Sequence, residues 1–293
     1  MSHRGAIAAL LLSAIPTGAR AGDAPFVDPD TLIRRVVRSE RVAEKMLAAY
    51  TYDQVEVATK FAKKGVPKET EARLYYVFSG DAPGEGSREL VSVNGRPATA
   101  DEKQKVAEED AKSRKRSLER RAAARARTAP AVGADEDDPL VGAQRLSNLL
   151  AHYHYWIERE EVRDGRLCYV LRFSPRHGPK SRGLAEQALS ALAGEIVVDG
   201  TDYQVRALDA MLVSPVKVAG GIAARVDDAV VRYEAEPLAS SHRWFPCSVD
   251  LRLHGKTAIF LRLDVGYRYQ FTNFKTFRVE TESSASEGPP GGE

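Results

Sequence analysis

The stretch Tyr267-Arg-Tyr-Gln-Phe-Thr-Asn-Phe-Lys-Thr-Phe277 is rich in aromatic residues, which favour β-strands. It closes a region, 193–280, in which one predicted strand follows another, separated by turn signals such as Asp199-Gly200 and His254-Gly255. We read 257–269 and a closing segment through Val279 as two successive strands. The region contains no catalytic motif, so it favours a sheet whose apolar face holds something apolar.

The residues before this region predict more of the same sheet, preceded by a helix. Asp28-Pro29 has the form of a helix N-terminus, and apolar residues then recur at helical spacing to Tyr50. On this helix Glu40 is assigned to the polar side. Alternating patterns at 51–61, 69–79, 88–93, 152–162 and 166–173 predict strands, with turns at Asn94-Gly95 and Asp164-Gly165.

These patterns predict an α+β fold that is mainly antiparallel β, with about 10–11 strands and two or three helices. An antiparallel sheet of that size must curl. With helices packed on or in the concave face, the curled sheet would have an apolar interior.

The N-terminus predicts export. Arg4 precedes the apolar run 5–15, and Ala19-Arg20-Ala21 is a small-residue cleavage site. The run is too short to span a membrane. We therefore expect cleavage after Ala21 and a periplasmic mature chain without a transmembrane segment. The signal removes two arginines, so the formal charge of +2 falls to zero, and nucleic-acid binding is not expected.

The mature chain is predicted to form one domain, 22–280, followed by a disordered tail, 281–293. Residues 98–138 differ from their surroundings. After a capping box at Thr99-Ala-Asp-Glu102, the residues to about Arg127 are helix formers with almost nothing apolar except Val106 and Leu118, and 129–138 holds Pro, Gly and four acids. Within them, 112–127 carries eight basic residues and one acid. We interpret 98–138 as a charged helical or flexible insertion, solvated or paired with the acids near its end.

No residue pattern predicts catalysis or a cofactor. His152 and His154 share a strand face with two glutamates, but a polar strand face is the favoured interpretation over a zinc site, so no metal is predicted. Cys168 and Cys247 fall on opposite strand faces by alternation, which disfavours a disulfide, although a sheet edge or loop would permit one. The chain is expected to be a monomeric binding protein and not an enzyme.

Three segments resemble the outer-membrane lipoprotein-sorting (LolA/LolB/RseB-like) family. They are Leu192-Ala-Gly-Glu-Ile-Val-Val-Asp-Gly-Thr-Asp-Tyr203, Trp244-Phe-Pro246, and the aromatic strand from Phe271 to Phe277. The amphipathic first helix and Val93-Asn-Gly-Arg-Pro97 before a charged helix are similar too. The resemblance covers most of 28–280 and implies an unclosed half-barrel, with a helical lid over a cavity that accepts acyl chains. The charged insertion departs from the carrier proper.

The resemblance implies a periplasmic carrier of lipid or lipoprotein acyl chains. The alternative is an RseB-like sensory or structural module that binds an inner- or outer-membrane protein partner through the sheet or the charged insertion. Strand alternation gives candidates for the cavity lining, for each of which a filled core is the simpler reading: Val55, Val57, Leu74, Tyr76, Phe78, Tyr153, Tyr155, Ile157, Tyr169, Leu171, Phe173, Val249, Leu251, Leu253, Ile259, Leu261 and Leu263.

Overall fold

The structure, a computed structural model, describes residues 27–78, 86–126, 146–150, 153–176, 191–218, 224–238, 243–257 and 261–276. The predicted signal peptide, the end of the charged insertion and the predicted disordered tail lie outside these residues. No helix in the described part of the chain is both long and apolar enough to cross a membrane.

The first helix, α1 (Pro29–Leu47), begins where the sequence predicts it. The carboxylate of Asp28 accepts a hydrogen bond from the backbone N–H of Thr31 at 2.9 Å, and Pro29 occupies the first turn. Leu32 and Val36 are fully buried on the inner side. The assignment of Glu40 to the polar side was wrong, because this residue is also buried.

Twelve strands of the described residues form one sheet, in the order β4-β3-β2-β1-β12-β11-β10-β8-β7-β6-β5, with β9 paired to β10. Every pairing is antiparallel, and the edge strands β4 and β5 do not pair, so the sheet is an unclosed half-barrel. Twelve strands slightly exceed the predicted 10–11, and two of the twelve, β4 and β9, are only 2 and 3 residues long. The strands are β1 (Tyr50–Phe61), β2 (Pro67–Phe78), β3 (Ser87–Val93), β4 (Arg96–Pro97), β5 (Tyr153–Arg163), β6 (Arg166–Pro175), β7 (Leu192–Asp199), β8 (Val205–Leu212), β9 (Val216–Val218), β10 (Ala224–Leu238), β11 (Arg243–Thr257) and β12 (Leu261–Thr276).

The first and last long strands of the chain pair in the middle of the sheet. β1 lies beside β12, with Val57 opposite Arg268 and Val55 opposite Gln270. The prediction of two strands after residue 256 was wrong, because β12 runs unbroken from Leu261 to Thr276. An irregularity in its pairing with β1 accompanies the left-handed backbone of Asn273 (φ 56°).

Three predicted turns are confirmed, among them Asp199-Gly200 at the end of β7, and one was wrong. Asn94-Gly95 and Asp164-Gly165 have positive φ at both residues, as a tight hairpin turn requires. Gly255 instead lies within β11, paired with Val226 and Leu263. A Cβ there would collide with the backbone carbonyl oxygen of Arg225, so glycine at this position allows β10 and β11 to approach closely.

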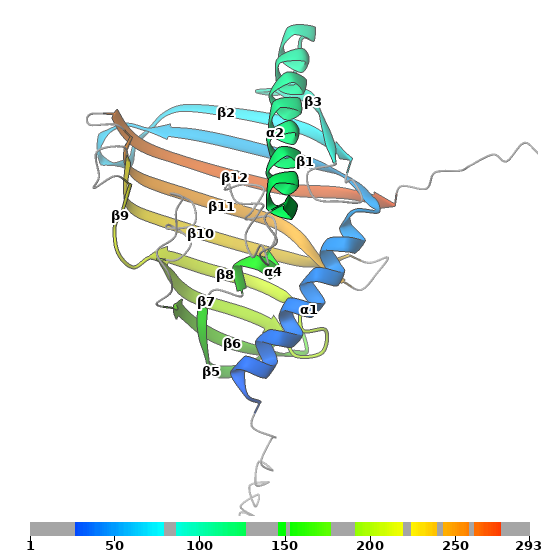
Figure 1. The fold of residues 1–293 in the computed structure, drawn as a ribbon, viewed down its shortest axis with the longest axis vertical. Helices are drawn as coiled ribbons and strands as arrows, with labels where there is room; N and C mark the ends of the chain where they lie inside the picture. Colours follow the sequence, from blue (N-terminus) through cyan, green and yellow to red (C-terminus); the bar gives the residue numbers. More distant parts are fainter. Residues whose placement is uncertain are drawn as a thin grey trace, which may run out of the picture.

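Both long helices lie on one face of the sheet (Figure 1). α1 and the short α4 (Leu146–Leu149) pack over β5 to β8, whereas α2 (Ala100–Ala126) packs on β3. The predicted capping box of α2 is confirmed: the Thr99 N–H donates to the Glu102 carboxylate at 2.9 Å, and the Glu102 N–H donates to the Thr99 hydroxyl at 3.3 Å.

Candidate functional site

The sheet face beneath the two helices, here called the covered face, can be followed from strand to strand. Leu32 and Val36 of α1 pack in one cluster with Ile196 of β7, and Val231 of β10 packs against that cluster. Residues directly opposite each other in adjacent strands share a face. Val231 is opposite Leu251, so β11 and, in turn, β12 continue the covered face through Leu251 and its partner Tyr267.

Beneath α1 the covered face is a packed core. Six of the predicted cavity residues lie here, four of them buried and two partly buried at its margin: Tyr153, Tyr155, Leu171, Phe173, Ile157 and Tyr169. The ring centroids of Tyr153 and Phe173 are 4.8 Å apart, and the Tyr155 hydroxyl donates to the Leu150 carbonyl at 2.8 Å. Side chains of α1 and α4 complete this cluster, so it fixes the helices to the sheet.

Further along the covered face, β11 and β12 carry apolar side chains that are only partly buried. This set, here called the open strip, comprises Val249, Leu251, Leu253, Leu263, Val265 and Tyr267. Leu251 is opposite Tyr267 and Leu253 is opposite Val265. Of the predicted candidates, Val249, Leu251, Leu253 and Leu263 belong to this strip, while Leu261 begins β12 and Ile259 lies outside the described residues.

The prediction missed Val265 and Tyr267. Their alternation with Leu263 and Tyr269 was visible in the sequence, and it gives both of them the same strand parity as the predicted Leu263. The open strip therefore extends further along β12 than the predicted set.

The five candidates on β1 and β2 lie on the other face of the sheet. They are Val55, Val57, Leu74, Tyr76 and Phe78. Val57 is opposite Arg268, which is opposite Asp250, and these two form an ion pair at 2.7 Å on the face away from the helices. The face assignment from apolar alternation was therefore wrong for these two strands.

Polar residues occupy the covered face of β1 and β2 because α2 supplies partners for them. Arg88 of β3 forms a two-pronged interaction with Asp110 of α2, at 3.0–3.2 Å, and lies 3.7 Å from Glu56 of β1. Its guanidinium also lies over the ring of Tyr75, 4.4 Å from the centroid. Together with buried Val106, these contacts attach the first part of α2 to the sheet.

Glu40 is a buried acid inside the packed core. Its carboxylate accepts a hydrogen bond of 2.6 Å from the backbone N–H of Val205, at the start of β8. Burial raises the pKa of Glu40 to about 8, the hydrogen bond from Val205 opposes this, and the nearby Glu44 adds to it. The carboxyl is therefore largely protonated at neutral pH, which lets it lie beneath α1 without a cation.

The described residues contain neither a disulfide nor a cluster of metal ligands. Cys168 and Cys247 are both free thiols. Within the described ranges, no three His, Cys, Asp or Glu side chains lie together as metal ligands would, and His152 lies outside those ranges.

No protein-family model and no curated protein matches the chain. Similar solved structures include a LolA-superfamily protein from Nitrosomonas europaea, at 11% identity over 86% of this chain and 95% of that chain, with a TM-score of 0.36. A DUF1329-family protein from Desulfovibrio piger matches at 13% identity over 85% and 94%, with a TM-score of 0.36. An outer-membrane lipoprotein-sorting protein domain from Vibrio parahaemolyticus matches at 11% identity over 86% and 94%, with a TM-score of 0.37.

Two of these three structures bear the name of the group that the sequence resembles. The fold of this chain is defined by its unclosed antiparallel sheet and its strand order.

Proposed function

We propose that the protein is an exported, periplasmic carrier that shelters acyl chains of lipid or lipoprotein against the open strip and performs no chemistry on them. The observation that carries the proposal is the difference between two parts of one apolar face. Beneath α1 the face is filled by helix side chains, whereas the residues of the open strip remain partly exposed. At one end of the strip, Val249 and Tyr267 pack against the buried Tyr269 and Phe271.

An apolar strip can supply the free energy that is needed to keep an acyl chain out of water. Each methylene group removed from water contributes about 0.8 kcal/mol, so a long acyl chain needs on the order of 10 kcal/mol of shelter. Leu251, Leu253 and Leu263 offer branched aliphatic surface for this purpose. The core beneath α1 would keep the sheet in shape, and the strip would be the part of the covered face that is open to cargo.

Replacing Leu251 by lysine is expected to lower acyl-chain binding at least tenfold. The substitution places a charge at the centre of the strip, and burying an unpaired charge against an acyl chain is strongly unfavourable. Native mass spectrometry of the mature protein with a long-chain phospholipid measures the change. The matched control is Val162→Lys, since Val162 is 71% exposed on β5.

Both variants are expected to keep their circular dichroism spectrum and melting temperature close to the wild type, because Leu251 is only partly buried and Val162 is exposed. Equal lipid occupancy in Leu251→Lys and the wild type, or no lipid binding by the wild type, would contradict the carrier proposal.

A second candidate function, binding of a protein partner through α2, is favoured by the state of that helix beyond Asp110. Lys112, Lys115 and Arg116 are exposed, and their only ion pair among the described residues joins Lys115 to Glu119 at 4.0 Å. Cross-linking in intact cells tests this candidate. Lys112→Glu/Arg116→Glu is expected to remove a cross-linked envelope protein that Leu251→Lys retains, and unchanged cross-links in the charge variant would rule out this role.

A further inference from the structure

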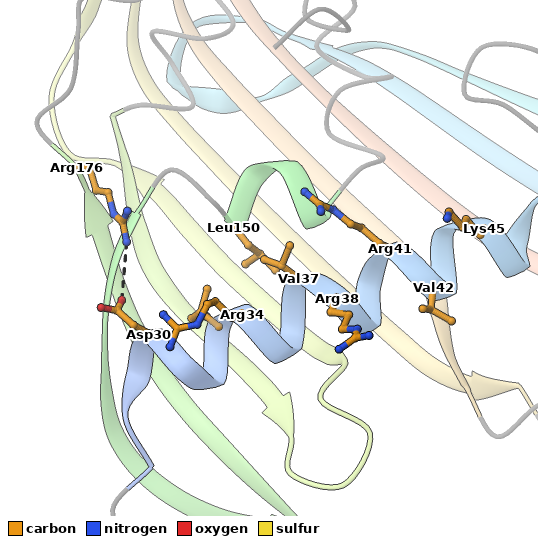
Figure 2. Close-up of a pocket in the computed structure, with 10 residues that line it drawn as sticks. Asp30, Arg34, Val37, Arg38, Arg41, Val42, Lys45, Leu150 and Arg176 are labelled. Carbon is orange, nitrogen blue, oxygen red and sulfur yellow. Dashed lines mark ion pairs between the residues drawn. The ribbon is translucent and has the colours of Figure 1, made fainter. Parts of the chain in front are cut away.

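A groove of about 820 Å³ runs beside α1, on the side of the helix that faces α4 and the end of β6. Figure 2 shows its lining residues. Five cationic side chains border it, and one carboxylate, Asp30, accompanies them. The cations are Arg34, Arg38, Arg41, Lys45 and Arg176.

The cations of α1 lie along one face of the helix. Arg34, Arg38, Arg41 and Lys45 are spaced by four, three and four residues, the spacing at which helix side chains are neighbours. Like charges at this spacing repel each other. An anion placed among these side chains therefore relieves an unfavourable interaction within the helix.

Most of this positive charge is uncompensated. Arg176 is paired with Asp30 at 3.8 Å, and Arg34 is 3.9 Å from Asp28. Arg38, Arg41 and Lys45 have no ion-pair or hydrogen-bond partner among the residues that the structure describes. These three exposed side chains are available to an external anion.

The groove also has an apolar floor. Ile33 and Leu150 are buried at 8% and 1% exposure, Val37 is partly buried, and Val42 is 42% exposed. Figure 2 shows Val37 and Leu150 meeting between α1 and α4, with Arg34 and Arg41 to either side of them. A ligand that satisfies both parts of the groove must have an anionic group joined to an apolar portion.

We propose that this groove binds one anionic phospholipid molecule, with the headgroup phosphate among Arg38, Arg41 and Lys45 and the first part of its chains against Val37 and Leu150. Arginine provides planar donors that match the geometry of phosphate oxygens, and lysine adds a point charge. The groove is distinct from the open strip, so it adds a headgroup preference to the proposed function without depending on it.

The test compares two lysophospholipids below their micelle-forming concentrations, one with an anionic phosphatidylglycerol headgroup and one with a zwitterionic phosphatidylcholine headgroup. Isothermal titration calorimetry of the mature wild-type protein is expected to show at least tenfold tighter binding of the anionic lipid, with a preference that weakens as salt is added. Equal affinities for the two lipids would overturn the proposal.

The variant Arg38→Glu/Arg41→Glu is expected to lose the preference, whereas Lys68→Glu/Lys217→Glu, which makes the same change in net charge at exposed positions elsewhere, keeps it. Retention of the preference by the groove variant would overturn the proposal. Both pairs are exposed, so circular dichroism and thermal melting should show folded proteins.

Two further measurements show whether the bound anion is a single lipid molecule, free phosphate or a membrane surface. Inorganic phosphate alone is expected to bind far more weakly than the anionic lipid, and equal affinity would reassign the groove to a free anion. Binding to anionic vesicles without binding to the dispersed lipid would replace the single-molecule site by a membrane-surface contact. The variant Leu251→Lys separates this proposal from the carrier proposal. If it keeps both the headgroup preference and the acyl-chain binding of the wild type, the groove proposal stands and acyl-chain binding at the open strip is overturned.

Discussion

Replacing Glu40 by glutamine is expected to remove most of the loss of stability that the protein undergoes between about pH 5 and pH 8. The carboxyl of Glu40 is buried beneath α1, and its pKa is raised from 4.5 to about 8 in the folded protein. In the unfolded chain the group ionises near its ordinary value. Between the two pKa values the folded state binds the proton and the unfolded state does not.

The sign of the effect follows from this difference. The stabilising contribution is fully present below about pH 4.5 and is lost as the pH rises through 8, because ionisation then favours the unfolded chain. Each pH unit within the window changes the free energy of unfolding by about 1.4 kcal/mol, so the total is a few kcal/mol. Glutamine imitates the neutral acid, and its amide oxygen can accept the hydrogen bond from Val205.

Urea unfolding at pH 5, 6.5 and 8 measures this prediction as the difference between wild type and variant. Glu40→Gln should be the more stable protein at pH 8, with little difference at pH 5. The matched control is Glu160→Gln on the exposed side of β5, which should leave the pH dependence unchanged. An identical decline in wild type and Glu40→Gln would show that Glu40 does not control it.

Replacing Asp199 by alanine is expected to lower the free energy of unfolding by about 3 kcal/mol at pH 7. The carboxylate is fully buried at the end of β7 and accepts hydrogen bonds from Arg166 at 2.6 and 2.9 Å. It also accepts the backbone N–H groups of Thr201 and Asp202, each at 2.9 Å. Burial raises the pKa of Asp199, but these hydrogen bonds outweigh burial and leave the pKa below its ordinary value.

Alanine would leave the N–H groups of Thr201 and Asp202 in the β7–β8 turn without their shared acceptor, and it would remove the buried carboxylate that Arg166 of β6 contacts. The loss should appear as a lower urea midpoint with an unchanged slope. Asp202→Asn is the matched control, because Asp202 contacts the same arginine from a more exposed position and should cost less than 1 kcal/mol. Equal destabilisation by the two variants would mean that burial of Asp199 does not matter.

Local signals in the sequence predicted local structure well. The Asp28 cap, the capping box before α2 and the hairpin turns at Asn94-Gly95 and Asp164-Gly165 all have the predicted geometry. Each depends on residues within a few positions of one another. The large antiparallel sheet was also predictable, because it follows from many such segments taken together, whereas its unclosed form was implied by the family resemblance.

The incorrect predictions depended on residues distant in the chain. Strand alternation cannot say which face of β1 is covered, since Glu56 is placed there by Arg88 and Asp110, which come later. Glu40 reads as a surface residue until β8 is packed against it. The open strip was predicted in part because β11 and β12 are neighbours in the sequence and share one alternation.

The pairing of β1 with β12 also governs when the fold can be completed. Residues 50–60 must wait for residues 265–276, which lie more than two hundred positions later, before the centre of the sheet can form. Contacts over such separations make folding slow. In a chain that emerges from a ribosome or a translocation channel with its N-terminus first, β2, β3 and α2 can join β1 early, but the other edge of β1 would remain unpaired until almost the whole protein has appeared. A holding chaperone would have its longest period of action on that unpaired edge of β1, and truncation before residue 265 should yield an aggregation-prone product rather than a smaller folded domain.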